Sequence, residues 1–152
     1  MSSIANSDGK VILVVDDEPL IALITAKILT QTGLKVIVAA DGEAGLRAFL
    51  AHSQEIDLIL TDVVLPVMDG ITMVKEIRKS QPEARVLLMS GYPQRILSTP
   101  HRSEFAFIRK PFQSKDLVLA INAMLDEEAS KPESSPLFSW PHGSKTLRHL
   151  RR

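Results

Sequence analysis

The chain has 152 residues, 45% of them hydrophobic, and its 18 basic side chains balance its 18 acidic ones. This length allows one well-buried domain and is too short for two ordinary ones. The absence of cysteine excludes a disulfide framework, thiolate metal sites and thiol nucleophiles, and favours a reducing, cytoplasmic setting. No apolar run approaches the roughly 18 residues of a membrane-spanning helix, and residues 1–9 lack the pattern of a signal peptide.

Apolar runs typical of strands alternate along the chain with stretches of helical period. We expect strands over 11–16, 35–39, 56–61, 84–89 and 105–109, and helices over 19–31, 42–51, 70–80 and 114–128. Such repeated β-α units predict a doubly wound, five-stranded parallel sheet with helices on both faces. Ligands of that architecture bind at the carboxyl ends of the strands.

The first helix has Pro19 in its first turn and Gly33 just beyond its end, both of which suit those positions. Its apolar spacing predicts the face that packs on the sheet, formed by Leu20, Leu23, Ile24 and Ile28. The last helix is expected to begin at Ser114 with Asp116 in its first turn. Between Tyr92 and Glu104 the prolines leave room only for a short or ragged helix.

The two ends of the chain differ in composition from its body. Residues 1–128 hold 17 acids and 13 bases, whereas residues 129–152 hold one acid and five bases. We therefore expect a flexible N-terminus over 1–9, one domain over 10–128 and a flexible, basic, Ser/Pro-rich tail over 129–152 without an output domain. Binding of nucleic acid or an anionic membrane by this short tail is a minor hypothesis beside that of a solvated tail.

Acidic residues end two of the expected strands. Asp16 and Asp17 follow the first strand, and Asp62 follows the third. If these strands are neighbours, the three carboxylates converge into an all-oxygen site that suits Mg²⁺. Ser90 after the fourth strand and Lys110 after the fifth add a hydroxyl and an ammonium, so the set could bind a phosphoryl group and neutralise its charge during transfer.

Each of these residues also has a purely structural interpretation. Asp17 and Glu18 could cap the first helix, and Lys110-Pro111 could simply end a strand. We interpret Asp69-Gly70 as a turn and helix start without catalytic role.

Four segments, VILVVDDEP, LILTDVVLPVMDG, LLMSG and RKPF, resemble in order and spacing the receiver domain of two-component response regulators, over roughly residues 10–128. The resemblance implies a flavodoxin-like strand order, 2-1-3-4-5, and a cis bond before Pro111. It implies Asp62 as the phosphoacceptor, with Lys110 and Ser90 contacting the phosphoryl group. It also implies that Mg²⁺ or Mn²⁺ is bound directly by Asp17, Asp62 and the backbone carbonyl of Val64, and that Asp16 acts mainly through a metal-bound water.

The same resemblance implies that Ser90 and Phe107 form a switch, although Phe107 could equally be a core aromatic residue. The phosphoryl group would come from a histidine kinase or a histidine phosphotransfer protein, and the switch would change binding to a downstream protein target. The domain would catalyse only its own phosphorylation and dephosphorylation, as a monomer or weak dimer without direct DNA binding. A single-domain regulator or a receiver cut from a hybrid kinase fits the sequence, and the SGY at Ser90 is similar to the hybrid type.

Two other functions stay open. A degenerate receiver would act only as a protein-interaction module. A haloacid-dehalogenase-like, Mg²⁺-dependent phosphatase would need a second aspartate two residues after its nucleophile, where this chain has Glu18 or Pro19. Beside the site, Val64 is apolar and Tyr92 is aromatic, which reduces the ability of these positions to orient an attacking water, so we expect slower loss of the phosphoryl group than with polar residues there.

Overall fold

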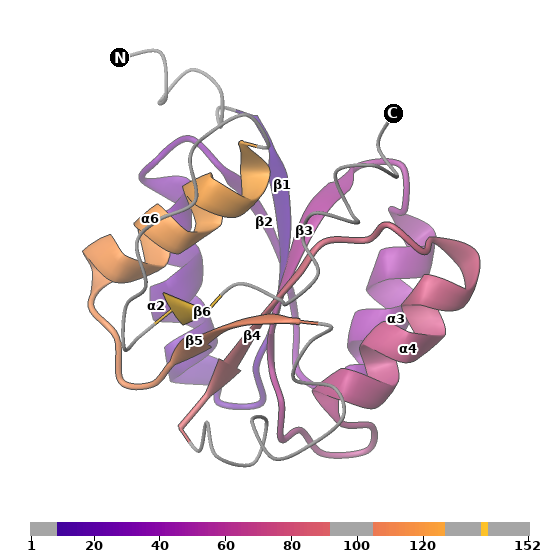
Figure 1. Cartoon of the computed structure of the whole chain (residues 1–152). Coiled ribbons are helices and arrows are strands. Elements are labelled where there is room, and N and C mark those ends of the chain that lie inside the picture. The colour runs from indigo at the N-terminus through magenta and orange to yellow at the C-terminus, as the bar shows by residue number, and fades with distance from the viewer. Residues whose placement is uncertain (1–8, 92–104, 127–137, 140–152) are drawn as a thin grey trace.

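The structure is a computed structural model that describes residues 9–91, 105–126 and 138–139. In these ranges strands and helices alternate as expected (Figure 1). The strands are β1 (Val11–Val15), β2 (Lys35–Ala39), β3 (Ile56–Asp62), β4 (Val86–Ser90), β5 (Ala106–Arg109) and β6 (Phe138–Ser139). The helices are α2 (Pro19–Thr30), α3 (Gly42–Ala51), α4 (Gly70–Ser80) and α6 (Ser114–Leu125). The short helix expected between Tyr92 and Glu104 lies outside the described residues.

The sheet has the order β2-β1-β3-β4-β5-β6. Its first five strands are parallel, which confirms the expected order 2-1-3-4-5. A sixth strand, which the sequence analysis did not predict, lies outside these five: Phe138–Ser139 pairs antiparallel with β5. A strand of two residues is too short to produce an alternating pattern, so no strand signal is visible between Pro136 and Pro141.

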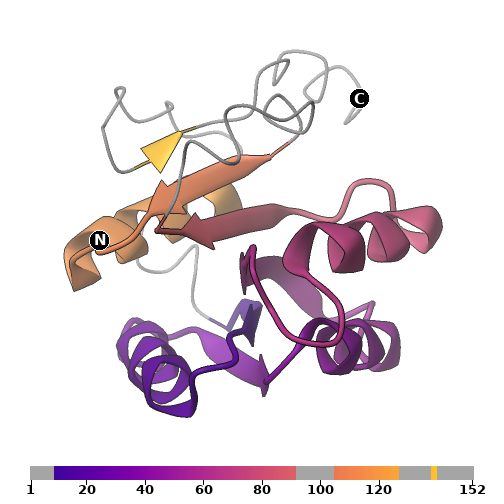
Figure 2. The ribbon, with the colours of Figure 1, turned by 90° about the horizontal axis from the view of Figure 1, so that it is seen from below.

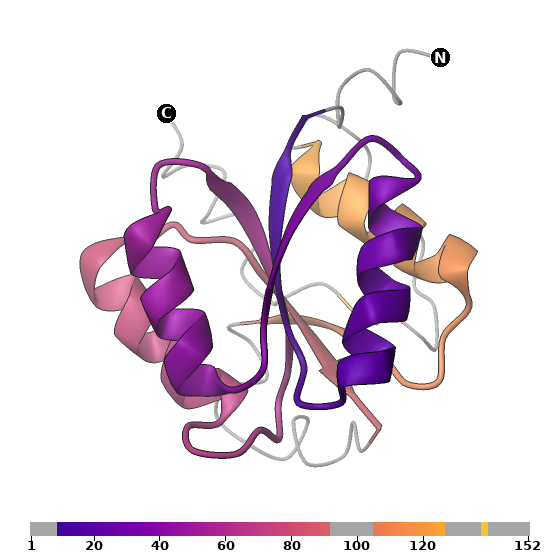
Figure 3. The ribbon, with the colours of Figure 1, turned by 180° about the vertical axis from the view of Figure 1, so that it is seen from behind.

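Helices cover both faces of the sheet, and each face has its own core (Figures 2 and 3). On one face α3 and α4 pack through Phe49, Met73 and Ile77 against β1 and β3. On the other, Leu29 of α2 and Ile121 of α6 are buried against the alternate residues of the same strands. Strands buried on both faces explain why the strand segments read as continuous apolar runs.

Helix α2 packs by a different face from the one expected. Its buried residues are Ala22, Thr25 and Leu29, whereas Leu20 and Leu23 are 67% and 65% exposed. The prediction was wrong because α2 is apolar around most of its circumference, so period alone does not select a face. The small side chains of Ala22 and Thr25 let the helix lie close to the sheet. The large side chains of Leu20, Ile21, Leu23 and Ile24 therefore face outward.

Polar residues fix where the helices begin. Asp41 accepts a hydrogen bond from Ala44 N at 2.7 Å, and Asp69 accepts one from Thr72 N at 2.8 Å. Both are N-caps, which confirms the interpretation of Asp69-Gly70 as a helix start. Pro19 opens α2 and Gly33 has a φ of 92°, as the sequence predicts for a start and a stop. Among the described residues, the helices are too short or too polar to cross a bilayer.

Candidate functional site

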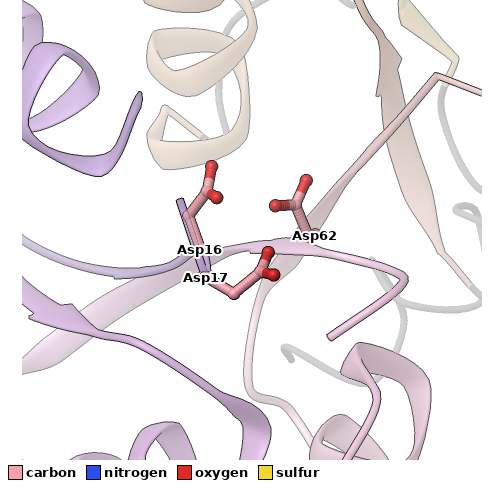
Figure 4. A group of neighbouring side chains, drawn as sticks. All are labelled: Asp16, Asp17 and Asp62. Atoms are coloured by element: carbon pink, nitrogen blue, oxygen red, sulfur yellow. The ribbon is translucent and has the colours of Figure 1, made fainter. Parts of the chain in front are cut away.

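Three carboxylates meet at the carboxyl edge of the sheet (Figure 4). Strands β1 and β3 are neighbours, and Val15 pairs with Thr61, so the residues that follow each of them lie side by side. Asp16, Asp17 and Asp62 each place a carboxylate oxygen within 4.8 Å of the others. The convergence predicted from the sequence is therefore present in the structure.

Asp16 is the most buried member of the cluster, with 1% of its surface exposed. Its Oδ1 accepts a hydrogen bond from Glu18 N at 2.9 Å, which orders the start of α2. Its buried Oδ2 has no hydrogen-bond partner within the described part of the chain. A buried carboxylate oxygen without a donor is costly. The alternative role of Glu18 as a side-chain cap is not observed, because this N-cap residue forms no side-chain capping bond.

Lys110 supplies positive charge to the cluster. It follows β5 directly, and its backbone N–H donates to Ser90 O at 2.8 Å, which ties it to the end of β4. Its Nζ lies 2.5 Å from Asp62 Oδ1 and 3.9 Å from Asp16 Oδ2. The bond between Lys110 and Pro111 is cis, as the resemblance implied. One ammonium against three carboxylates leaves an excess of negative charge when all are ionised.

The surroundings favour the protonated form of Asp62. Burial raises the pKa of its carboxyl from the ordinary 3.8 to about 7; Lys110 opposes this rise and the neighbouring Asp16 adds to it. Without a further cation, Asp62 therefore holds its proton at a higher pH than an ordinary aspartate does. Additional positive charge at this edge would allow all three acids to ionise.

The donor set fits a divalent cation. Asp16 Oδ2 accepts no hydrogen bond and has only the distant Lys110 ammonium as an ion-pair partner, and the nearby oxygens of Asp17 and Asp62 are of the same hard type. Such ligands suit Mg²⁺, which binds through one or two carboxylates and keeps several waters. The residues present therefore agree with the metal site expected from the sequence.

The remaining predicted residues surround this cluster. Ser90, 9% exposed, comes one position after Met89, which pairs with Asp62. Val64 is 64% exposed in the loop that follows β3. Phe107 is 6% exposed and packs in the core on the α3/α4 face, so it is part of the core whether or not it also switches. Tyr92 lies outside the described residues.

Two glycines near the site have a packing role that the sequence analysis missed. A Cβ on Gly70 would lie 2.1 Å from Asp62 O, and one on Gly42 would lie 1.9 Å from Met68 O. Gly70 N also donates to Val63 O at 2.8 Å. The loop between β3 and α4 is thus packed tightly at both ends, which fixes the backbone of Asp62. The DG pair at the start of α4 was a signal for this contact as well as for a turn.

The same loop contains a backbone conformation that L-residues rarely adopt. Val67 has a φ of 68°, and Met68 N donates to Pro66 O across it at 2.7 Å. A β-branched residue with positive φ is strained. This strain lies five residues from Asp62, in the part of the molecule that carries the charged cluster.

Comparisons with known proteins agree with this geometry. The family model described as the response regulator receiver domain matches residues 12–122. The chemotaxis protein CheY of Bacillus subtilis is 33% identical over 118 residues, which cover 76% of this chain and 97% of CheY. The sensor kinase CckA of Brucella abortus is 32% identical over 124 residues, covering 80% of this chain but 13% of the kinase.

Solved structures show the same likeness. The response regulator TrrA from Thermotoga maritima, in complex with Mg²⁺-BeF, has a TM-score of 0.67 and 28% sequence identity, covering 76% of this chain and 98% of TrrA. The family match covers most of the chain, including both strands that end in the acidic residues. The protein therefore belongs to the response regulator receiver domain family, whose members are phosphoaccepting signalling domains of two-component systems.

Proposed function

We propose that Asp62 is the phosphoacceptor of this receiver, that the donor is a histidine kinase or a histidine phosphotransfer protein, and that phosphorylation changes binding to a downstream protein. The observation that carries the proposal is the position of Asp62 at the end of β3. There it lies beside two further carboxylates and 2.5 Å from the Lys110 ammonium. This is the arrangement that an acyl phosphate requires.

The transfer uses a carboxylate oxygen of Asp62 as the nucleophile. This oxygen forms a bond to phosphorus while the bond between phosphorus and the donor's imidazole nitrogen breaks. The electron pair of the broken bond stays on that nitrogen. Lys110 neutralises charge on the phosphoryl oxygens, and Ser90 donates a hydrogen bond to one of them. The aspartate must be ionised to attack, so its raised pKa has to be lowered before transfer.

A divalent cation, Mg²⁺ or Mn²⁺, would supply this charge. Asp17, Asp62 and the backbone carbonyl of Val64 are the proposed direct ligands, and Asp16 is proposed to act mainly through a metal-bound water. When bound, such a cation lowers the pKa of nearby carboxyls and neutralises charge in phosphoryl transfer. The buried Asp16 Oδ2, which accepts no hydrogen bond, supports this assignment.

The first test is the intact mass of the protein after incubation with Mg²⁺ and acetyl phosphate. We expect a gain of one phosphoryl group in the natural protein and none in Asp62→Asn. The matched control is Asp69→Asn, which removes a charge from the same loop and keeps the helix cap, because Asn caps as well as Asp. It should be phosphorylated normally.

The same experiment separates the alternatives. Continuous release of phosphate from small substrates without a stable adduct would favour the phosphatase. Neither adduct nor turnover would leave a module that acts only by binding. An adduct on Asp62→Asn would overturn the assignment of that residue.

The outward face of α2 is the proposed docking surface for the phosphodonor protein. It consists of Leu20, Ile21, Leu23 and Ile24, which are 67%, 38%, 65% and 48% exposed. The helix begins two residues after Asp17, so this surface lies beside the cluster. A group of exposed large apolar side chains is typical of a protein interaction site.

The docking proposal predicts different effects on large and small donors. Leu23→Ser should slow transfer from a phosphorylated histidine kinase of the same organism at least about tenfold, since a buried Leu contributes roughly 1.5–3 kcal/mol. Phosphorylation by acetyl phosphate should not change, because that donor needs no docking surface. The control is Leu119→Ser on α6, with the same 65% exposure. Equal transfer to both variants would contradict docking on α2.

The lifetime of the phosphoryl group is a separate proposal that rests on Val64. Its side chain is exposed two residues after Asp62 and cannot orient an attacking water. Val64→Asn should therefore shorten the half-life of the phosphorylated protein severalfold, measured by loss of the mass adduct. An unchanged or longer half-life would rule out this role.

The domain bounds, the location, the oligomeric state and the lack of turnover are further proposals. Residues 10–128 form the proposed receiver, in agreement with the match over 12–122. A cytoplasmic location, a monomer or weak dimer and the lack of turnover on external substrates are consistent with a signalling domain. Both a single-domain regulator and a receiver within a hybrid kinase have relatives among the matched proteins.

A further inference from the structure

The free side of β5 is the second edge of the parallel sheet. β5 pairs with β4 on one side through Leu87–Ser90, and the other side would expose unpaired N–H and C=O groups. In the structure this side is occupied by β6, with Phe107 opposite Ser139 and Ile108 opposite Phe138. Figures 1 and 2 show β6 beside β5, at the opposite edge of the sheet from β2.

We propose that Phe138–Ser139 is an intramolecular cap on the β5 edge, and that this edge is a binding surface for an extended peptide strand whose resident occupant is the chain's own C-terminal segment. A partner that adds a strand to β5 must then displace the cap. The proposal concerns an edge of the sheet and does not depend on which residue accepts phosphate.

The direction of the backbone groups of β5 supports the cap. Lys110 N donates to Ser90 O, so Lys110 directs its N–H toward β4. Successive residues of a strand direct their N–H groups to alternate sides. Ile108 therefore also faces β4, whereas Phe107 directs its N–H and C=O away from β4, toward β6. Phe107 is also the residue opposite Ser139, so the two can exchange backbone hydrogen bonds.

Chain length permits this return. The 12 residues of α6 extend roughly 18 Å, and the 11 residues between Asp126 and Phe138 can span up to about 36 Å. Because the segment is attached to the domain, its effective concentration at the edge is in the millimolar range or higher for a short linker. A weak pairing is therefore enough to keep the edge occupied.

The sequence around the cap also limits its strength. Pro136 and Pro141 flank it, and a proline has no N–H to donate to a strand partner. Pairing cannot extend as a regular ladder past these positions. Because the cap is this short, a partner strand can displace it. A long sixth strand would pair with β5 too stably to be displaced.

The position of the cap gives it access to the charged site. β5 carries Phe107, and Lys110 follows two residues after Ile108. β6 therefore pairs with the strand that is followed by Lys110, whose ammonium contacts Asp62. A partner strand bound at this edge would be held beside the charged cluster.

The test is amide hydrogen exchange of the full chain, followed by NMR. The variant is Ser139→Pro, which removes the N–H opposite Phe107, and the control is Ser144→Pro in the same tail. We expect exchange of the Phe107 amide to become at least about tenfold faster in Ser139→Pro, since local opening governs exchange. The Ile108 amide, which faces β4, is the internal control and should keep its rate.

A second measurement uses the peptide of residues 134–143 added to Ser139→Pro. It should restore protection of the Phe107 amide in a concentration-dependent manner, while a peptide that carries the same Ser139→Pro change should not. The proposal is overturned if the Phe107 amide exchanges at the same rate in Ser139→Pro and Ser144→Pro, or if the natural-sequence peptide restores nothing.

Discussion

The interior of the domain and the carboxyl edge of its sheet are built in opposite ways. In the interior, Leu13, Ile59 and Ile77 are fully buried among other apolar side chains. At the edge, Asp16 has a buried oxygen without a donor and Asp62 has a raised pKa. The interior therefore supplies the stability of the domain, whereas the edge retains unfavourable charge that a ligand can relieve.

A substitution in the interior should change stability most. Ile77→Ala in α4 should lower the free energy of unfolding by about 2–5 kcal/mol, because it leaves a cavity in a packed core. Urea denaturation at pH 8 with a chelator measures this. A loss below about 1 kcal/mol would contradict the view that this layer carries the stability of the domain.

The next largest effect has the opposite sign and lies at the edge. Asp62→Asn should stabilise the metal-free protein at pH 8 by at least about 1 kcal/mol, because it removes a buried charge that folding disfavours. Asp17 is exposed, so Asp17→Asn should give a smaller gain in the same denaturation experiment. A larger gain for Asp17→Asn would show that the cost of the cluster lies elsewhere.

The raised pKa of Asp62 also fixes a pH dependence. The folded state binds the proton more tightly than the unfolded state, so this group lowers the free energy of unfolding as pH rises from about 4 to about 7, with no further change above. The difference between the natural protein and Asp62→Asn isolates this effect. Mg²⁺ competes with the proton, so its affinity should rise over the same range. A difference independent of pH would contradict the assignment.

A smaller gain is expected in the loop beside the site. Val67→Asn should stabilise the protein by about 1 kcal/mol, since Asn tolerates positive φ better than a β-branched residue. Val64→Asn is the control, because Val64 is similarly exposed in the same loop and has an ordinary φ. Thermal unfolding measures both. A shift in the melting temperature shared by both variants would indicate an effect of polarity rather than of strain.

The smallest effect on stability is expected on the outward face of α2. The side chain of Leu23 is mostly exposed. Beyond the lower helix propensity of Ser, Leu23→Ser should therefore change the free energy of unfolding by no more than about 0.5 kcal/mol. Chemical denaturation measures this. A loss comparable with that of Ile77→Ala would mean that Leu23 packs within the domain, and would remove it from the proposed docking surface.

Much of the fold could be predicted because its signals are local. The strands are continuous apolar runs, and polar or proline residues mark the helix starts at Pro19, Asp41 and Asp69. The convergence of Asp16, Asp17 and Asp62 follows once β1 and β3 are neighbours. Local signals did not predict the order of the strands in the sheet. The resemblance to receiver domains predicted that order.

The failures have physical reasons as well. The face of α2 was wrong because folding used the small residues Ala22 and Thr25, whereas the prediction followed the large ones. β6 was missed because a two-residue strand depends on its partner β5 and has no pattern of its own. The contact of Gly70 with the Asp62 carbonyl depends on the path of a loop, which residue spacing does not reveal.

The tight packing at Gly42 and Gly70 has a consequence for how such a domain can vary. Because both ends of the loop after β3 are held against backbone, we expect substitutions at its exposed positions, Val64 and Val67, to leave Asp62, the proposed phosphoacceptor, where it is. Selection can then adjust how long a signal lasts without disturbing how it is received. On these proposals, the timing of the response depends on exposed residues of one short loop, and its chemistry depends on Asp62 at the end of the preceding strand.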